Sequence, residues 1–229
     1  MRLFLLRHGQ THGNVSGALD TGLPGLDLTD LGRRQAQAAS RALAPEGIGA
    51  IAVSTLVRTS QTAAPVATEL GLIPVGHDGL REIAAGDFEM RADDDAILGY
   101  LGTVAQWLDG DLEQRMPGGE TGVAFLERYD AAITSTCALA VDAALVVSHG
   151  AAIRTWVTHR AGGAHAPIHE GLHNTGCITL DGSLESGWTI TNWAREPIGG
   201  AWLDDDQARD PTGGELDQDE KTPGQSSGS

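Results

Sequence analysis

The stretch Leu3-Phe4-Leu5-Leu6-Arg7-His8-Gly9 joins an apolar run to a charged turn near the start of the 229-residue chain. Four consecutive apolar residues predict a strand that is buried on both faces, since a half-solvated strand would alternate apolar and polar side chains. The pattern recurs at Val146-Val147-Ser148-His149-Gly150. The chain therefore contains two predicted buried strands that each end in a His-Gly pair.

Other apolar runs alternate with stretches of helical spacing. A third strand is predicted at Ala50-Ile51-Ala52-Val53, and helices are predicted at 29–44, 59–70 and 151–159, the first of them capped by Thr29. Strands that alternate with helices indicate an α/β fold, a three-layer sandwich with a mostly parallel central sheet and helices on both faces.

Two further segments complete the expected domain, which spans residues 1–202. Residues 84–119 are rich in Gly and Asp and contain Pro117-Gly118-Gly119, which predicts a partly helical lid excursion over the sheet. Residues 175–180 and 188–193 are predicted to form two strands, late in the chain, near an edge of the sheet.

The two His-Gly pairs are expected to face one crevice, because ligands of an open parallel sheet bind beyond the carboxyl ends of its strands. The third strand is followed by Ser54-Thr55-Leu56-Val57-Arg58, which adds a guanidinium at the same edge. Gly9 and Gly150 permit close backbone approach, and amides at a helix start favour an anion. Two histidines with Arg7 and Arg58 therefore predict a phosphate pocket.

The overall composition limits the classes of molecule that the chain is expected to bind. Lys+Arg 15 against Asp+Glu 31 gives a net charge of -16, which disfavours nucleic acid and anionic membranes as partners. Cys137 and Cys177 cannot form a disulfide framework, and the apolar run at residues 1–6 is too short for a signal peptide, so a cytoplasmic protein is expected. We expect a small phosphorylated substrate and no cofactor or metal, and a homodimer is left open.

The last 27 residues differ in composition from the rest. Residues 203–229 combine eight acidic side chains with Gly, Pro, Gln and Ser, and such a segment buries too little apolar surface to offset its ordering entropy. We predict a disordered acidic tail with no specific role. The alternative is a tethering or autoinhibitory element that competes for the cationic site.

Six blocks of the sequence resemble the histidine phosphatase superfamily, which also contains the cofactor-dependent phosphoglycerate mutases. They run in the family's order over roughly residues 1–195, and six ordered blocks are far more specific than one triplet. The blocks are Leu6-Arg7-His8-Gly9-Gln10-Thr11 with Asn14; Leu28-Thr29 with Gly32 and Gln35-Ala36; Ser54 with Arg58 and Gln61-Thr62-Ala63; Leu80-Arg81-Glu82-Ile83 with Gly86 and Glu89; Pro117-Gly118-Gly119-Glu120; and Val147-Ser148-His149-Gly150 with Ile153-Arg154.

The resemblance implies a catalytic nucleophile and a general acid. His8 would attack phosphorus in its neutral form, with its second ring nitrogen held by a backbone carbonyl, and become a phosphohistidine. Glu82 would protonate the departing alkoxide and then deprotonate the incoming water.

The resemblance also implies the groups that bind the phosphoryl oxygens. Arg7, Arg58 and His149 would hold these oxygens and stabilise the transition state, with Asn14 and the Gly150 amide assisting. The implied activity is hydrolysis of a phosphomonoester by a histidine acid-type phosphatase without metal or cofactor.

The family's pattern is not matched throughout. Met90 follows Glu89 where many members have glycine, and the excursion lacks the arginine cluster and the Tyr-Asp-x-Pro-Pro-Pro-like segment of the mutases. Between Phe88 and Gly118 only Arg91 and Arg115 are basic, against Glu89 and six further acidic residues, Asp93, Asp94, Asp95, Asp109, Asp111 and Glu113. A mutase must retain its phosphorylated intermediate under a closed cationic lid, so an acidic, open lid favours a phosphatase.

Three alternatives are open. They are a cofactor-dependent phosphoglycerate mutase-type phosphomutase, a catalytically silent phosphate-binding or regulatory protein, and a metal-dependent hydrolase that uses His8 and His149 as ligands. A zinc protease at His169-Glu170-Gly171-Leu172-His173 is rejected, because Pro167 and the Asn174-Thr175-Gly176 turn leave no room for a sustained helix. This segment is instead predicted to be a loop at the rim of the crevice, where His173 or Asn174 would contact substrate.

Overall fold

A computed structural model describes residues 1–139, 141–162, 171–205 and 207–214. Within these residues the strands are β1 (Arg2–Arg7), β2 (Ala50–Ser54), β3 (Val75–His77), β4 (Ala143–Ser148), β5 (Ala161–Gly162), β6 (Cys177–Ser183) and β7 (Gly187–Ala194). The helices are α1 (His12–Ser16), α2 (Asp30–Leu43), α3 (Val57–Leu70), α4 (Asp94–Leu108), α5 (Gly122–Cys137) and α6 (Gly150–Arg160). Four short 3-10 turns are η1 (Ala44–Glu46), η2 (Asp78–Leu80), η3 (Gly86–Phe88) and η4 (Ala201–Leu203).

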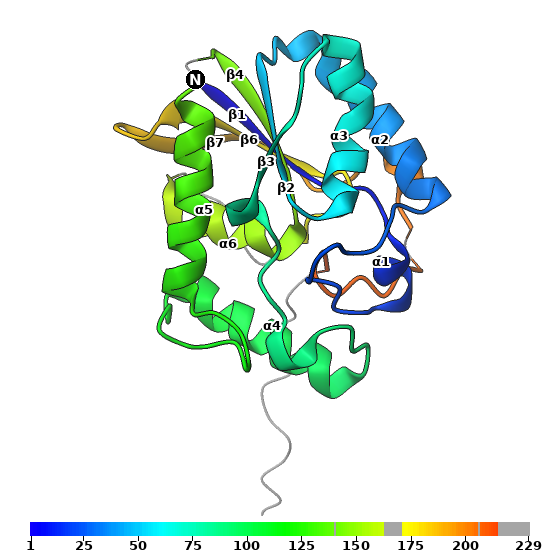
Figure 1. Ribbon diagram of the computed structural model, residues 1–229, viewed down its shortest axis with the longest axis vertical. Coiled ribbons are helices and arrows are strands. Elements are labelled where there is room, and N and C mark those ends of the chain that lie inside the picture. Colours follow the sequence, from blue (N-terminus) through cyan, green and yellow to red (C-terminus); the bar gives the residue numbers. More distant parts are fainter. Residues whose placement is uncertain (140, 163–170, 206, 215–229) are drawn as a thin grey trace, which may run out of the picture.

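The described strands form one mixed sheet in the order β3-β2-β4-β1-β6-β7-β5. The run from β3 to β1 is parallel, whereas β6 pairs antiparallel with both β1 and β7. Helices α2 and α3 lie on one side of this sheet, and α5 and α6 lie on the other (Figure 1). This arrangement confirms the predicted α/β sandwich, and the antiparallel pairs lie in the half of the sheet where the late strands were expected.

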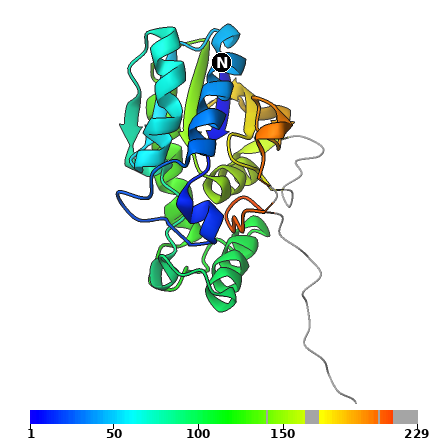
Figure 2. The same ribbon diagram turned by 90° about the vertical axis from the view of Figure 1, so that its right-hand side faces the viewer.

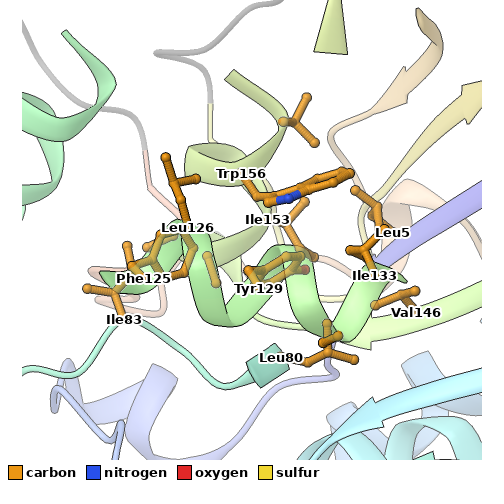
Figure 3. Packing of buried hydrophobic residues seen from close by; sticks show 14 of the residues in the cluster. Leu5, Leu80, Ile83, Phe125, Leu126, Tyr129, Ile133, Val146, Ile153 and Trp156 are labelled. Atoms are coloured by element: carbon orange, nitrogen blue, oxygen red, sulfur yellow. The ribbon is translucent and has the colours of Figure 1, made fainter. Parts of the chain in front are cut away.

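Side chains of the central strands alternate between two hydrophobic layers. Leu3 and Leu5 of β1 point into the layer beneath α4, α5 and α6, and Phe4 and Leu6 point into the layer beneath α2 and α3. Figure 3 shows the first layer, where Tyr129 of α5 lies beside Trp156 of α6 with ring centroids 5.6 Å apart. Both faces of β1 are therefore covered, which explains its continuous apolar run.

Most predicted elements lie within a few residues of their observed bounds. The Thr29 hydroxyl accepts a hydrogen bond from the Gly32 amide at 3.0 Å, which confirms it as the cap of α2. Within the predicted excursion, the helical part is α4, which is capped by Asp93. Residues 122–137, for which no element is predicted from the sequence, form helix α5, which covers one face of the sheet.

The C-terminal segment differs from the predicted disordered tail wherever it is described. Residues 203–205 and 207–214 run back across the molecule, and Figure 2 shows them in orange to red beside α1 and α6. Buried polar contacts of Asp210 and Thr212 hold this part of the segment together with the buried side chain of Leu203, and composition alone could not reveal these contacts. The remainder of the tail lies outside the described residues.

Candidate active site

The ends of β1 and β4 bring the two His-Gly pairs together. Arg7 pairs with Ser148 at the last register position of the two parallel strands, and the His8 amide donates to the Ser148 carbonyl at 3.0 Å. The imidazoles of His8 and His149 consequently lie edge to face, with ring centroids 5.1 Å apart. The prediction that both histidines share one crevice at the strand ends agrees with this geometry.

Hydrogen bonding fixes the tautomer of His8. Its Nδ1 lies 2.7 Å from the Gly9 carbonyl oxygen, and because a carbonyl only accepts hydrogen bonds, Nδ1 carries the proton. The Nε2 atom of the neutral ring then keeps its lone pair. Burial, followed by the charges of Arg58 and Arg7, holds the pKa of His8 well below its ordinary value. A neutral imidazole with a free Nε2 is the form that can attack phosphorus.

His149 is also held neutral. Burial is the main cause that lowers its pKa well below the ordinary value, with the charge of Arg58 next. Its Nε2 lies 2.8 Å from the Ser54 hydroxyl, at the end of β2. Its Nδ1 has no hydrogen-bond partner among the described residues. This ring nitrogen is thus a buried polar atom left over for a ligand.

Two buried guanidinium groups flank the histidines. Arg58 lies in the first turn of α3, where it donates from Nη2 to the Asp20 carbonyl at 2.9 Å and from Nη1 to the Asp20 carboxylate at 3.3 Å. Arg7 is fully buried and donates from Nη1 to the Leu172 carbonyl at 2.8 Å. Burying two cations is costly unless anions compensate for them, so the site selects for anionic partners.

Glu82 follows the turn η2, and its carboxylate lies against the first turn of α6. Its Oε1 accepts from the amides of Ile83 and Ala152 at 2.9 and 2.8 Å, and its Oε2 accepts from the Ala151 amide at 3.3 Å. Burial raises the pKa of this carboxyl and outweighs the opposing effects of these amides and of Arg58. A carboxyl that keeps its proton to a higher pH than usual is suited to donate it to a leaving group.

These groups meet around one small cavity. His8, Arg58, Glu82 and Asn14 line it, and its volume is about 10 Å³, at the lower limit for holding one water molecule. Thr212 of the C-terminal segment lines the same cavity. Six of the predicted site residues, counting Arg7 and His149, are therefore gathered at one strand-end cluster, which the C-terminal segment covers.

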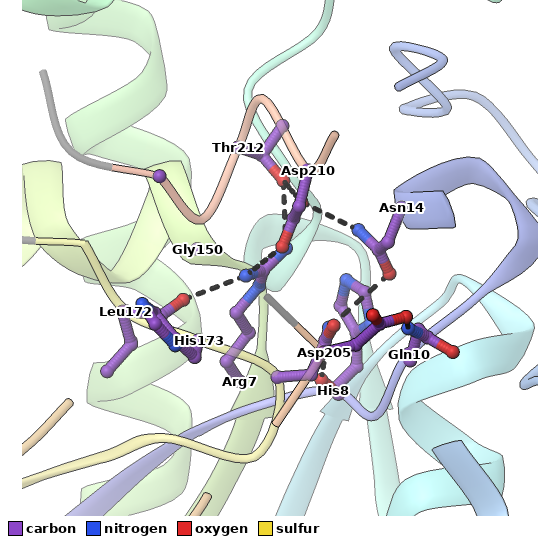
Figure 4. Close-up of polar contacts among 12 residues, drawn as sticks. Arg7, His8, Gln10, Asn14, Gly150, Leu172, His173, Asp205, Asp210 and Thr212 are labelled. Atoms are coloured by element: carbon purple, nitrogen blue, oxygen red, sulfur yellow. Dashed lines mark hydrogen bonds and ion pairs between the residues drawn. The ribbon is translucent and has the colours of Figure 1, made fainter. Parts of the chain in front are cut away.

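Asn14 and Gly150, the predicted assisting groups, are close to this segment. Asn14 donates from its amide nitrogen to an Asp210 carboxylate oxygen at 2.9 Å (Figure 4). Gly150 begins α6, and a side chain at this position would collide with the Thr212 carbonyl. The backbone that approaches Gly150 closely is thus that of Thr212 in the protein's own C-terminal segment.

Three acidic or polar groups at the site were not foreseen. Asp20 holds Arg58, while Asp210 and Thr212 contact Arg7. Asp20 lies in a loop without periodicity, and Asp210 lies in the segment whose composition predicted disorder. Two signals were available: the acidic composition of residues 203–229, for which an element that competes for the cationic site was the alternative, and the buried arginines of the pocket, which require nearby carboxylates.

The rejected zinc motif is only partly described. His165, His169 and Glu170 lie outside the described residues. His173 contacts Asp204, and Asn174 donates to the His8 carbonyl at 3.1 Å. Asn174 is thus beside the nucleophile candidate, as the predicted rim position requires, and its contact with substrate stays a prediction.

Comparison with known proteins assigns the family. The chain belongs to the histidine phosphatase superfamily (branch 1), whose sequence model matches residues 3–196. This agrees with the resemblance drawn from the six sequence blocks, and with a fold in which two strand-end histidines adjoin buried arginines.

Two relatives share about a third of their residues with the chain. A probable phosphoglycerate mutase GpmB from Yersinia pestis is 32% identical over 201 residues, covering 87% of this chain and 93% of that protein. The PE-PGRS family protein PE_PGRS11 from Mycobacterium tuberculosis is 35% identical over 217 residues, or 86% of this chain. The match covers 37% of that second protein, so the chain spans well under half of its length.

Solved structures with the same fold include phosphatases. A mycobacterial glucosyl-3-phosphoglycerate phosphatase in complex with VO3 superimposes with a TM-score of 0.71 at 26% identity, covering 85% of this chain and 99% of that one. The alpha-ribazole phosphatase from Shigella flexneri gives a TM-score of 0.68 at 25% identity, covering 86% and 97%. The family and these neighbours together indicate a phosphatase or phosphomutase enzyme. No helix among the described residues is long and apolar enough to cross a membrane.

Proposed function

We propose that the chain is a phosphomonoester hydrolase that acts on a small phosphorylated metabolite through a phosphohistidine at His8, without a metal or cofactor. The observation that carries the proposal is the state of His8. Its Nδ1 donates to the Gly9 carbonyl, its pKa is held well below the ordinary value, and its Nε2 is free in a cluster with Arg58 and Glu82.

The first half-reaction transfers the phosphoryl group to the protein. The Nε2 lone pair of His8 forms the P–N bond while the P–O bond of the ester breaks, and the Glu82 proton goes to the departing alkoxide. The Gly9 carbonyl accepts the Nδ1 hydrogen bond and stabilises the positive charge that develops on the ring. Arg7, Arg58 and the Nδ1 of His149 would hold the phosphoryl oxygens.

The second half-reaction releases phosphate. Glu82, now ionised, takes a proton from an incoming water, whose oxygen attacks phosphorus as the P–N bond breaks. The electron pair returns to Nε2, inorganic phosphate leaves, and both residues regain their starting protonation. No outside oxidant, reductant or metal is required for this balance.

Charge near the site supports hydrolysis over mutase chemistry. Asp20 lines the cavity beside Arg58, and the lid helix α4 begins with Asp93, Asp94 and Asp95. A mutase must bind a second anionic group and exclude water, and acidic groups at the entrance oppose both requirements. The similarity to a probable phosphoglycerate mutase keeps phosphomutase as the second candidate.

A screen of phosphorylated metabolites, run in chelator with the wild type and with His8→Ala side by side, tests the proposal. We expect phosphate release by the wild type alone, undiminished by the chelator. Activity that vanishes in chelator and returns with metal would contradict the proposal. Phosphoglycerate isomerisation that depends on a bisphosphate primer would assign the mutase instead.

A further inference from the structure

The described end of the chain, residues 204–205 and 207–214, is called the strap below. It lies on predicted phosphate-binding groups, and its Asp210 is 203 residues from Arg7 and 196 residues from Asn14 in sequence. The Asp205 carboxylate accepts a hydrogen bond from the Gln10 side chain at 2.7 Å (Figure 4). Asp204 contacts His173. The strap is therefore held to the loops that follow β1 and precede β6.

Asp210 of the strap engages Arg7 through both of its oxygens. Arg7 Nη1 lies 2.6 Å from Oδ2, and Nη2 donates to Oδ1 at 2.7 Å. Asn14 donates to Oδ1 as well, at 2.9 Å, and the Thr212 hydroxyl accepts from Arg7 Nη2 at 3.1 Å. A planar guanidinium binds a carboxylate and a phosphoryl group with the same pair of parallel hydrogen bonds.

The strap backbone is equally close to the site. The Thr212 and Gly214 carbonyls accept from Arg154, a fully buried arginine of α6, at 3.2 and 3.1 Å. A side-chain carbon on Gly213 would collide with Arg7 Nη1 and would lie 2.6 Å from an Asp210 carboxylate oxygen. The strap can therefore pack against Arg7 in this way only with glycine at position 213.

The closed strap leaves no room for a substrate. The cavity that His8, Arg58, Glu82 and Thr212 line has a volume of about 10 Å³, which is at the lower limit for one water molecule. Both Nη atoms of Arg7 are engaged by the strap and by Leu172. A phosphate monoester can bind Arg7 only after Asp210 leaves.

We propose that the strap is an autoinhibitory element, in which Asp210 occupies on Arg7 and Asn14 the place of a substrate's phosphoryl oxygens and is displaced by a phosphate monoester dianion. The inference rests on the proposed function, because it takes these groups as the phosphate site. An enzyme whose binding-competent form is a minor state binds its ligand more weakly by the fraction that is open. The strap therefore sets the phosphate concentration at which the enzyme responds.

Binding of inorganic phosphate to Asp210→Asn, followed by calorimetry, tests the proposal. The neutral amide weakens the contact with Arg7 but keeps its shape, so we expect at least about tenfold tighter phosphate binding than in the wild type. Asp111→Asn, which removes the same charge from an exposed residue, is the matched control and should bind phosphate as the wild type does. Equal or weaker binding by Asp210→Asn would overturn the proposal, because Asp210 would then be a part of the phosphate site.

Gly213→Ala provides a test that leaves the charge unchanged. Gly213 lies outside the left-handed region, so its backbone conformation needs no glycine. The methyl group of alanine would collide with Arg7 and force the strap away from it. We expect phosphate to bind more tightly here too. Unchanged or weaker binding would count against the proposal.

Two further readouts separate the strap from the proposed function. In the wild type, added phosphate should speed hydrogen exchange at amides of residues 207–214, and an unchanged rate would contradict displacement. The kcat/KM for p-nitrophenyl phosphate should rise in both variants with kcat little altered. Tighter phosphate binding without hydrolysis of any ester would uphold the strap and refute the hydrolase.

Discussion

Replacement of Glu82 by glutamine removes the proton that the leaving group is proposed to receive, while the shape of the site is kept. The variant can retain the two short contacts from Ile83 and Ala152 to Oε1. Its amide nitrogen would face the Ala151 amide, the longest contact of the three at 3.3 Å, so the fold should tolerate the change. Any loss of rate can then be assigned to proton transfer.

The expected magnitude depends on the leaving group. A positioned general acid contributes roughly 10²- to 10⁴-fold, or about 2.7–5.5 kcal/mol of activation free energy, when an alkoxide must depart. p-Nitrophenolate barely needs a proton, so Glu82→Gln should slow its release by less than about tenfold. The assay compares kcat/KM for an alkyl phosphate and for p-nitrophenyl phosphate in both proteins. Equal slowing of the two substrates would refute the role of Glu82.

The pH profile gives a second readout for the same variant. Because the pKa of Glu82 is raised, its protonated form persists above the range of an ordinary glutamate. The wild-type kcat/KM for the alkyl phosphate should fall as pH rises through this pKa, since the acid loses its proton. Glu82→Gln should lack that descending limb, and an identical limb in the variant would point to another group.

Three further predictions concern stability and reactivity. Asp20→Ala leaves the buried guanidinium of Arg58 without its carboxylate and should lower the free energy of unfolding by about 3 kcal/mol in urea titrations; a loss below 1 kcal/mol would show that the pair is dispensable. Folding depresses the pKa of His8 and His149, so the unfolded state binds more protons than the folded state below pH 6.5. As the pH is lowered from 6.5, the free energy of unfolding should therefore fall by up to about 1.4 kcal/mol per pH unit for each histidine, and less steeply in His149→Gln, as urea titrations over this pH range would show. Burial raises the pKa of the Cys177 thiol to about 12, so a thiol reagent at pH 8 should spare Cys177 in the native protein, as peptide mass spectrometry would report.

The parts of the fold that the sequence predicted well are those with local periodicity. The apolar runs of β1, β2 and β4 have a continuous pattern because both faces of each strand are covered. The strand-end rule then placed His8, His149 and Arg58 at one edge, since the carboxyl ends of parallel strands coincide. Helix α5 was missed although Phe125, Tyr129 and Ile133 recur at helical spacing.

The parts that could not be predicted depend on contacts between distant segments. Glu82 follows the short turn η2 and is positioned by amides at the start of α6. No local sequence pattern indicates this contact. Asp210 lies in a segment of low hydrophobicity, and its partner Arg7 is 203 positions away. Disorder was predicted because composition measures apolar burial, whereas a buried ion pair with a bidentate arginine holds this part of the chain.

The central claim, a phosphohistidine at His8, is tested most directly by trapping the intermediate. The protein is mixed with phosphorus-32-labelled substrate, quenched in alkali within the first turnovers and digested for peptide mapping. We predict an acid-labile, base-stable label on the peptide that contains His8, present in the matched variant His12→Ala and absent from His8→Ala. A label that survives in His8→Ala, or hydrolysis by the wild type with no label on this peptide, would contradict the account.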